Sequence, residues 1–266
     1  MGTQGTVDRG QGPAILLIPG IQSRWEFMRR TVDTLAARGF RVLSFSLGAP
    51  ADRGAPLDPA RGFAHDVARI DRLLDRAGLP QAAVCGMSAG GEVAVQYAAD
   101  RPGRVSHLIL VSAAGPRWTP DAQMHRYLRR PLLFAPAFLA GTRARLAPEI
   151  RAAYPRRRDR VAFAARQLMT LLTAPVSPRQ MAERARLMAR VDLTDACRRI
   201  SAPTLVITGE DALDTIVPAA ATREYVGLIR NARAATIERT GHVGLVTRPD
   251  RFAELVGEFI NGSARP

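Results

Sequence analysis

The chain has 266 residues, of which 47% are hydrophobic, so it is long enough to bury the core of one large α/β domain. It has no run of about 18 apolar residues, and the sequence therefore predicts no transmembrane helix. The net charge of +14 comes from arginine alone, because the sequence contains no lysine.

The basic charge is concentrated in residues 115–200, which hold 18 arginines against 6 acidic residues. The favoured interpretation is a solvated, arginine-rich helical surface. An anionic membrane surface or an acidic substrate stays open as a partner of this segment. Nucleic acid is disfavoured, because no binding motif or aromatic platform accompanies the arginines.

The first 13 residues are polar and rich in glycine, and they lack the apolar stretch of a signal peptide. The two cysteines, Cys85 and Cys197, lie far apart in the sequence, and Cys85 falls in an apolar run where a buried thiol is expected. We therefore expect no disulfide, a reducing compartment and a cytoplasmic location.

The first half of the chain alternates between apolar strands and amphipathic helices. The continuous apolar run at residues 14–18 is typical of a strand that is buried on both faces of a parallel sheet. The expected strands are residues 3–7, 14–18, 40–46, 81–85 and 105–111. The expected helices are residues 24–38, with Ser23 as the cap, 60–77 and 92–99, and residues 47–59 are expected to form a loop.

The alternation stops after residue 114 and resumes near residue 203. The expected elements of the second half are helices at 148–153, 159–172 and 178–190, a strand at 203–209, a helix at 218–229, a strand at 234–238 and a helix at 249–260. This order predicts an α/β fold with a mostly parallel central sheet and helices on both faces. Residues 1–114 and 201–266 form the core, and residues 115–200 form an inserted helical cap, unless those helices pack directly on a sheet face.

Residues 86–90, Gly-Met-Ser-Ala-Gly, connect an expected strand to an expected helix and match the G-x-S-x-G nucleophile elbow. In such an elbow Ser88 stands in a strained turn with its hydroxyl raised, and glycines at 86 and 90 leave room where strand and helix crowd together. The alternative, a glycine-rich turn with a surface serine, is disfavoured by the strand before it and the helix after it.

A serine hydroxyl needs a general base beside it, and the sequence offers four histidines. His242 follows Gly241 just after an expected strand, at the edge where open α/β sheets bind ligands. His65 lies on an amphipathic helix and His107 in a buried strand, so we expect both to be structural. His125 lies in the cap, where it is solvated, packed or part of a pocket wall.

The base needs a carboxylate to orient it, and three of them follow the strand that ends at Gly209: Glu210, Asp211 and Asp214. Pro218 marks the start of the next helix, since proline suits a first helical turn. An oxyanion needs backbone donors, and the candidates are the N–H of Ala89, after the serine, and that of Ile21, in the loop after the first central strand. A plain strand-ending turn is the alternative interpretation of the second loop.

Serine, acid and histidine occur in the order of the α/β-hydrolase superfamily, and the chain resembles the cap-bearing serine hydrolases of its esterase, lipase and haloperoxidase-like group. The resemblance covers nearly the whole chain and rests on residues 86–90, 209–218 and 241–242. In the family the acid stands four residues before the helix-starting proline, which implies Asp214, whereas the distance from Gly209 points to Asp211 or Ala212. Pro19-Gly20 stands where the family usually has His-Gly, and the short N-terminus implies that the first of the usual eight strands is missing.

The resemblance implies a serine mechanism that forms an acyl-enzyme on Ser88 with His242 and Asp214, but it does not specify the substrate. Our main hypothesis is a carboxylic-ester hydrolase, and bulky apolar residues near the cap suggest a small, apolar, ester-like molecule. We find no metal-ligand cluster or dinucleotide fingerprint and expect no metal or organic cofactor. Trp25, Trp118 and His125 are expected to shape the substrate pocket, together with Tyr127. Carbon–carbon bond hydrolases, lactonases, perhydrolases, acyltransferases and a non-catalytic binding protein of the same fold remain the alternatives.

Overall fold

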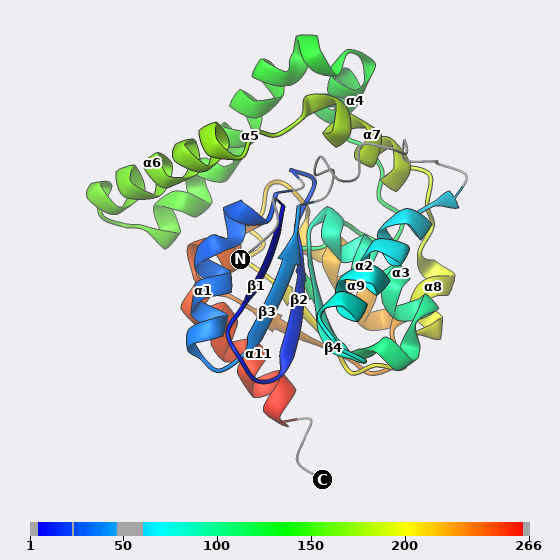
Figure 1. Cartoon of the computed structure of the whole chain (residues 1–266). Helices are drawn as coiled ribbons and strands as arrows, with labels where there is room; N and C mark the ends of the chain where they lie inside the picture. The colour runs from blue at the N-terminus through cyan, green and yellow to red at the C-terminus, as the bar shows by residue number, and fades with distance from the viewer. Residues whose placement is uncertain (1–4, 23, 47–60, 263–266) are drawn as a thin grey trace.

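The computed structural model describes residues 5–22, 24–46 and 61–262. The described strands form one sheet in the order β1-β3-β2-β4-β5-β6-β7 (Figure 1). The strand β1 runs antiparallel to β3, and every other neighbouring pair is parallel. The strands are β1 (Thr6–Arg9), β2 (Ala14–Ile18), β3 (Arg41–Phe45), β4 (Ala82–Met87), β5 (Val105–Val111), β6 (Thr204–Thr208) and β7 (Ala232–Thr236).

Helices cover both faces of this sheet (Figure 1). On one face α1 (Arg29–Ala37) packs against α10 (Gly244–Thr247) and α11 (Pro249–Gly262). On the other face α3 (Ala89–Asp100) packs against α2 (Ala64–Arg76) and α8 (Thr194–Arg199). The helix α8 also contacts α9 (Ala219–Leu228). Short 3-10 helices in the described residues include η1 (Trp25–Met28) and η4 (Pro102–Arg104).

The strand β2 contributes side chains to both cores, as its continuous apolar run predicts. Leu16 and Ile18 belong to the core under α2 and α3, whereas Ile15 and Leu17 belong to the core under α1 and α11. All four side chains are essentially inaccessible to solvent. The expected mostly parallel α/β architecture is therefore confirmed.

Four further helices lie together above the sheet, over the edge where the parallel strands end (Figure 1). They are α4 (Ala122–Arg129), α5 (Pro131–Ala153), α6 (Arg157–Thr173) and α7 (Pro178–Met188), and we call them the cap helices. Met124, Tyr127 and Met181 are buried where α4, α5 and α7 meet.

Several elements differ in extent from those expected. The helix expected at 148–153 is the last part of α5, which continues through Pro136 and Pro148. The helix expected at 24–38 is divided into η1 and α1. The strand β7 begins two residues before the expected 234–238, because this edge strand is largely exposed and has no apolar run of its own.

The end of the segment expected as the cap packs on the core, because α8 lies against α3. Ser23 and residues 47–59, expected as a helix cap and a loop, lie outside the described residues. Cys85 and Cys197 are both buried free thiols. No helix in the described ranges has the length and hydropathy needed to cross a membrane.

Candidate active site

The turn between β4 and α3 holds Ser88 in a strained conformation. The backbone of Ser88 has φ 51° and ψ −124°, in a region that residues other than glycine seldom adopt. Its backbone N–H donates to the carbonyl oxygen of Val111 at 2.9 Å, which keeps the turn in register with β5. The side chain is therefore lifted away from the strand and stands at the carboxyl edge of the sheet, as the elbow motif predicts.

Glycines are required where α3 crosses the strands beside Ser88. A Cβ atom on Gly86 would overlap the backbone of Gly90, and one on Gly90 would lie 2.6 Å from the carbonyl oxygen of Pro19. These overlaps are with backbone atoms that cannot move independently, so a larger residue would displace the helix. The first turn of α3 can approach β2 and β4 this closely only because both positions lack a side chain.

The loop after β2 passes directly beside Ser88. A Cβ atom on Gly20 would lie 3.3 Å from Cβ of Ser88, which places the backbone of residues 19–21 next to the serine. Ile21 and Ala89 both line the cavity into which Ser88 opens. The structure thus brings together the two segments expected to supply backbone donors, and their role as an oxyanion hole remains a prediction.

His242 lies opposite Asp214. Nδ1 of His242 is 3.5 Å from Oδ1 of Asp214, and both side chains are almost fully buried. The same Oδ1 accepts hydrogen bonds from the backbone N–H groups of Val217 at 3.0 Å and Ile216 at 3.2 Å. Burial alone would raise the pKa of Asp214, but the facing His242 and these two N–H groups outweigh it and hold the pKa below its usual value.

Asp214 lies in the loop between β6 and α9, which we call the acid loop, and His242 lies in the loop between β7 and α10, which we call the histidine loop. The two loops are in contact because two glycines lie between them. A Cβ atom on Gly241 would lie 2.7 Å from the backbone nitrogen of Asp214, and one on Gly209 would lie 2.5 Å from Cα of Gly241. Side chains at either position would force the loops apart and would separate His242 from Asp214.

The other two carboxylates of the acid loop point elsewhere. Asp211 is exposed and forms a bidentate pair with Arg223, whose guanidinium lowers the pKa of that carboxyl group. Glu210 accepts a hydrogen bond of 2.7 Å from the backbone N–H of Arg239. Asp214 is therefore the carboxylate that faces His242, and the longer loop between strand and acid is anchored by Asp211 and Glu210.

The cap helix α5 contacts both the acid loop and the histidine loop, through residues that no sequence motif marks. Glu149, which is fully buried, accepts hydrogen bonds from the backbone N–H of Val243 at 2.9 Å and the hydroxyl of Thr240 at 2.5 Å. Burial raises the pKa of Glu149, and hydrogen bonds from the histidine loop together with the nearby His242 offset part of that rise.

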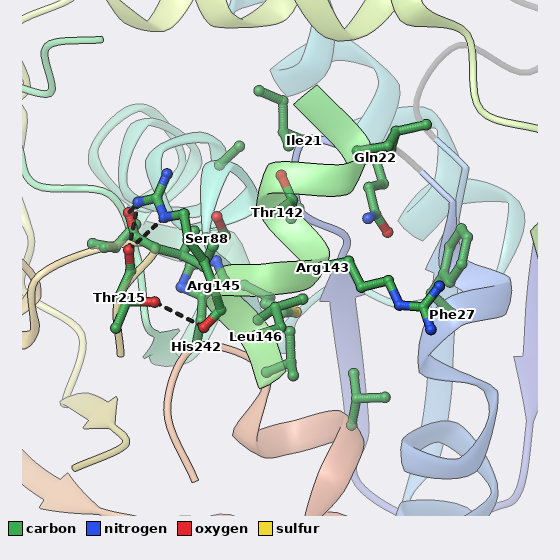
Figure 2. Close-up of a pocket in the computed structure, with 18 of the residues that line it drawn as sticks. Ile21, Gln22, Phe27, Ser88, Thr142, Arg143, Arg145, Leu146, Thr215 and His242 are labelled. Carbon is green, nitrogen blue, oxygen red and sulfur yellow. Dashed lines mark hydrogen bonds between the residues drawn. The ribbon is translucent and has the colours of Figure 1, made fainter. Parts of the chain in front are cut away.

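Arg145 stands one helical turn before Glu149 and binds the acid loop (Figure 2). Its Nε donates to the carbonyl oxygen of Thr215 at 2.7 Å and its Nη2 to that of Ile216 at 3.1 Å. In return the hydroxyl of Thr215 donates to the carbonyl oxygen of Arg145 at 2.8 Å. Positions i and i+4 of a helix share one face, so a single face of α5 holds the acid loop through Arg145 and the histidine loop through Glu149.

Ser88, Asp214 and His242 line one large cavity between the sheet edge and the cap helices. Figure 2 shows Ser88 and His242 in this cavity. Its volume is about 1430 Å³, and apolar side chains form most of its wall. Trp118 lines the cavity, and so does Tyr127.

Trp25 and His125, which were expected to shape the pocket, do not line this cavity. Trp25 packs against the core under α1, with the guanidinium of Arg29 5.0 Å from its ring centre. His125 is exposed on α4, because Met124 and Tyr127 are the residues of this helix that face the interior of the cap.

The remaining histidines lie away from Ser88. His107, on β5, packs edge-on against Phe259 with ring centres 5.2 Å apart, and burial lowers its pKa. His65 lies on α2. Among the described residues no group of three or more His, Cys, Asp and Glu side chains is arranged to hold a metal ion.

Comparison with known proteins identifies similar chains. A family model described as alpha/beta hydrolase fold matches residues 13–249. The chain is 28% identical to the pimeloyl-[acyl-carrier protein] methyl ester esterase of Aeromonas hydrophila over 270 residues, covering 94% of this chain and 96% of that protein. It is 26% identical over 261 residues to RutD of Variovorax paradoxus, whose name refers to carbamate hydrolysis, covering 96% and 94% of the two chains.

Solved structures share the fold. An esterase from Exiguobacterium antarcticum superposes with a TM-score of 0.76 and 20% identity, covering 96% of this chain and 94% of the esterase. An enol-lactonase from Burkholderia xenovorans superposes with a TM-score of 0.75 and 22% identity, covering 96% and 95%. At this level of identity the similarity establishes a common architecture.

Proposed function

The chain belongs to the alpha/beta hydrolase fold family, and on that premise we propose that it is a serine hydrolase that cleaves carboxylic esters through an acyl-enzyme. The observation that carries the proposal is the placement of His242 Nδ1 3.5 Å from the buried carboxylate of Asp214, in a cavity that also contains the strained Ser88. The names of the two curated relatives refer to a methyl ester and a carbamate, both of which carry a carbonyl group open to such attack.

In the proposed reaction Oγ of Ser88 attacks the ester carbonyl carbon while Nε2 of His242 accepts the hydroxyl proton. Nε2 has this role because Nδ1 faces Asp214. As the imidazole becomes charged, Nδ1 moves closer to Asp214 and donates a charge-assisted hydrogen bond to its carboxylate. The N–H groups of Ala89 and Ile21 then stabilise the oxyanion.

Collapse of this intermediate breaks the bond to the leaving alcohol, which takes the proton from His242. Water then attacks the acyl-Ser88 carbonyl, gives its proton to His242, and releases the acid and the free serine. One ester and one water thus give one acid and one alcohol, and the chain's own residues carry every proton.

The cavity favours a substrate with a long apolar acyl or alcohol chain. A volume of about 1430 Å³ exceeds the roughly 300–1,000 Å³ of pockets that take drug-sized ligands. Phe138, Leu146 and Ile150 of α5 line the cavity above the reacting groups. An apolar chain removes this surface from water, and each buried methylene adds about 0.8 kcal/mol to binding.

The test is hydrolysis of a series of p-nitrophenyl esters of increasing chain length by the wild type and by Ser88→Ala, with a lactone and a carbamate assayed alongside. We expect hydrolysis that improves with chain length and is lost in Ser88→Ala. Equal residual rates in both proteins would refute the serine mechanism. Failure of a fluorophosphonate probe to label folded wild type would instead favour a non-catalytic binding protein.

A further inference from the structure

The cap helices α5 and α6 expose several large apolar side chains. Six large apolar side chains in the described part of the chain are more than half exposed, and all belong to these two helices: Leu132, Leu133, Val161, Leu168, Met169 and Leu172. Single exposed apolar residues are common on soluble proteins, whereas six of them on two consecutive helices point to an interaction surface. We call these six residues the apolar face.

The helix α6 has no buried side chain over its 17 residues. A helix of a soluble domain ordinarily turns an apolar stripe to the core and a polar surface to water. In α6 the apolar side chains of Met169 and Leu172 are 59% and 68% exposed. The pattern fits a helix whose outer surface contacts something apolar other than the core of this protein.

The charge around the apolar face is strongly positive. Together α5 and α6 contain seven arginines and two acidic residues, and one of those acids, Glu149, is buried. Arg157 and Arg166 are exposed on α6, and the exposed Arg129 and Arg130 precede the start of α5. Apolar side chains with arginine and few acids are the composition of helices that lie in the headgroup layer of anionic membranes.

We propose that α5 and α6 dock the protein on a membrane surface that contains anionic lipids. The apolar face inserts among the lipid headgroups, and the neighbouring guanidinium groups bind lipid phosphates in the bidentate geometry that arginine allows. A second copy of the chain is the weaker occupant, because it would bring two strongly basic surfaces into contact.

Exposed apolar side chains of the same two helices also line the cavity, which favours lipid over a protein partner. Leu139, Val161 and Leu168 are exposed and also line the cavity that contains Ser88. An amphiphilic ester can therefore pass from the bilayer into the cavity along continuous apolar surface. This delivery rests on the proposed hydrolase function, whereas docking itself does not.

Docking is tested by sedimentation of the full chain with vesicles of phosphatidylcholine alone or mixed with phosphatidylglycerol, at several salt concentrations. We expect binding to the anionic vesicles to exceed binding to phosphatidylcholine by roughly tenfold or more and to fall with salt. Ser88→Ala should sediment like the wild type, so that loss of docking and loss of hydrolysis are separate results.

Two double variants locate the surface. Met169→Ser with Leu172→Ser removes apolar contact at positions that do not line the cavity, and Arg157→Gln with Arg166→Gln removes two charges. Each should reduce binding to anionic vesicles about tenfold.

Arg72→Gln with Arg76→Gln is the matched control, because it removes two exposed charges from the core helix α2 and should bind like the wild type. The proposal is overturned if anionic vesicles do not bind the protein, or if the face variants bind them as well as the wild type does. It is also overturned if Met169→Ser with Leu172→Ser separates a dimer while vesicle binding stays unchanged.

Discussion

Glu149 and Val243 are joined by a hydrogen bond of 2.9 Å that ties the cap helix α5 to the residue after His242. The same carboxylate accepts a hydrogen bond from the hydroxyl of Thr240. Arg145, on the preceding turn of α5, donates hydrogen bonds to the two backbone carbonyl groups that follow Asp214. The two loops that carry Asp214 and His242 are therefore fixed to each other by glycine contacts and to the cap by α5. A disturbance of α5 should reach these two side chains without touching them.

Glu149→Gln tests this connection. The substitution keeps one acceptor oxygen but replaces two charge-assisted hydrogen bonds by neutral ones, which are about half as strong. We expect kcat for a soluble ester to fall about tenfold with little change in KM, since a loosened histidine loop misplaces the base but leaves the cavity wall intact. The exposed Glu183→Gln on α7 is the control. If both variants retain wild-type kcat, Glu149 does not position His242.

Gly90 tests the elbow geometry. Alanine at this position would put Cβ 2.6 Å from the carbonyl oxygen of Pro19, so α3 must move away from the loop that follows β2. We expect Gly90→Ala to lower the unfolding free energy by about 1–3 kcal/mol and to reduce kcat by about a hundredfold. Urea unfolding measures the free energy of unfolding, and ester hydrolysis measures kcat.

Gly227→Ala is the opposite case. Gly227 lies in α9 with no atom within 4 Å of its would-be Cβ, so alanine should stabilise the protein by about 1 kcal/mol through helix propensity and leave kcat unchanged. Normal activity in Gly90→Ala would show that the elbow tolerates displacement.

The sequence predicted the sheet well because parallel strands carry a strong local signal. Strands such as β2 and β6 are continuous apolar runs, and each depends little on the rest of the chain. The helix α5 was largely missed, since Pro136 and Pro148 suggest breaks that its packing against α4 and α7 overrides. The edge strand β7 has no such run, and its position was misjudged by two residues.

The residues of the candidate site were likewise predicted only in part. Ser88 and His242 stand in short motifs whose spacing is visible in the sequence, and the choice of Asp214 depended on the distance to Pro218. Glu149 has no motif, because its role arises from a contact between a cap helix and a loop distant in sequence. Trp25 and His125 were chosen by residue type and position alone, and neither lines the cavity.

The buried Glu92 makes folding stability depend on pH. Its side chain is 2% exposed, and burial, only partly offset by Arg184, raises the pKa well above the ordinary 4.5. Above pH 4.5 the unfolded chain loses this proton while the folded protein keeps it, so stability falls as pH rises toward the folded pKa. The contribution to the slope is at most about 1.36 kcal/mol per pH unit.

Glu92→Gln should remove this component, and its unfolding free energy should vary less with pH than that of the wild type. The exposed Glu258→Gln should keep the wild-type slope. Urea unfolding at a series of pH values measures all three proteins. An identical slope in Glu92→Gln and the wild type would mean that Glu92 loses its proton equally in both states.

The pair Arg184–Asp66 ties the cap helix α7 to the core helix α2. Arg184 donates two hydrogen bonds, of 3.0 and 3.1 Å, to a carboxylate that is buried with it. Arg184→Met leaves Asp66 without its cation, which should cost about 3–5 kcal/mol of unfolding free energy, and Asp66→Leu in addition should restore most of the loss.

The exposed pair Arg198–Asp195 supplies the comparison, since Arg198→Met should change stability by less than about 1 kcal/mol. Equal effects of Arg184→Met and Arg198→Met would mean that burial adds nothing to the Arg184 pair. Thermal or urea unfolding of the four proteins decides between these outcomes.

Asp214 and Asp211 provide the most direct test of the proposed triad. Asp214 is buried 3.5 Å from Nδ1 of His242, whereas Asp211 is exposed and bound to Arg223. An asparagine at 214 cannot stabilise the charged imidazole and can present its amide N–H to Nδ1, which would favour the wrong tautomer. Asp214→Asn should therefore lower kcat by roughly 10⁴-fold, and Asp211→Asn should leave it nearly unchanged.

The same pair of variants separates catalysis from stability. The pKa of Asp214 lies below its usual value in the folded protein, so its carboxylate stabilises the fold above the ordinary 3.8, and that stability is lost as pH falls through the folded pKa. Asp214→Asn should lack this acid-side loss, which urea unfolding between neutral and acidic pH measures. If Asp211→Asn is the inactive protein and Asp214→Asn is active, the acid has been assigned to the wrong carboxylate, while the serine mechanism would stand.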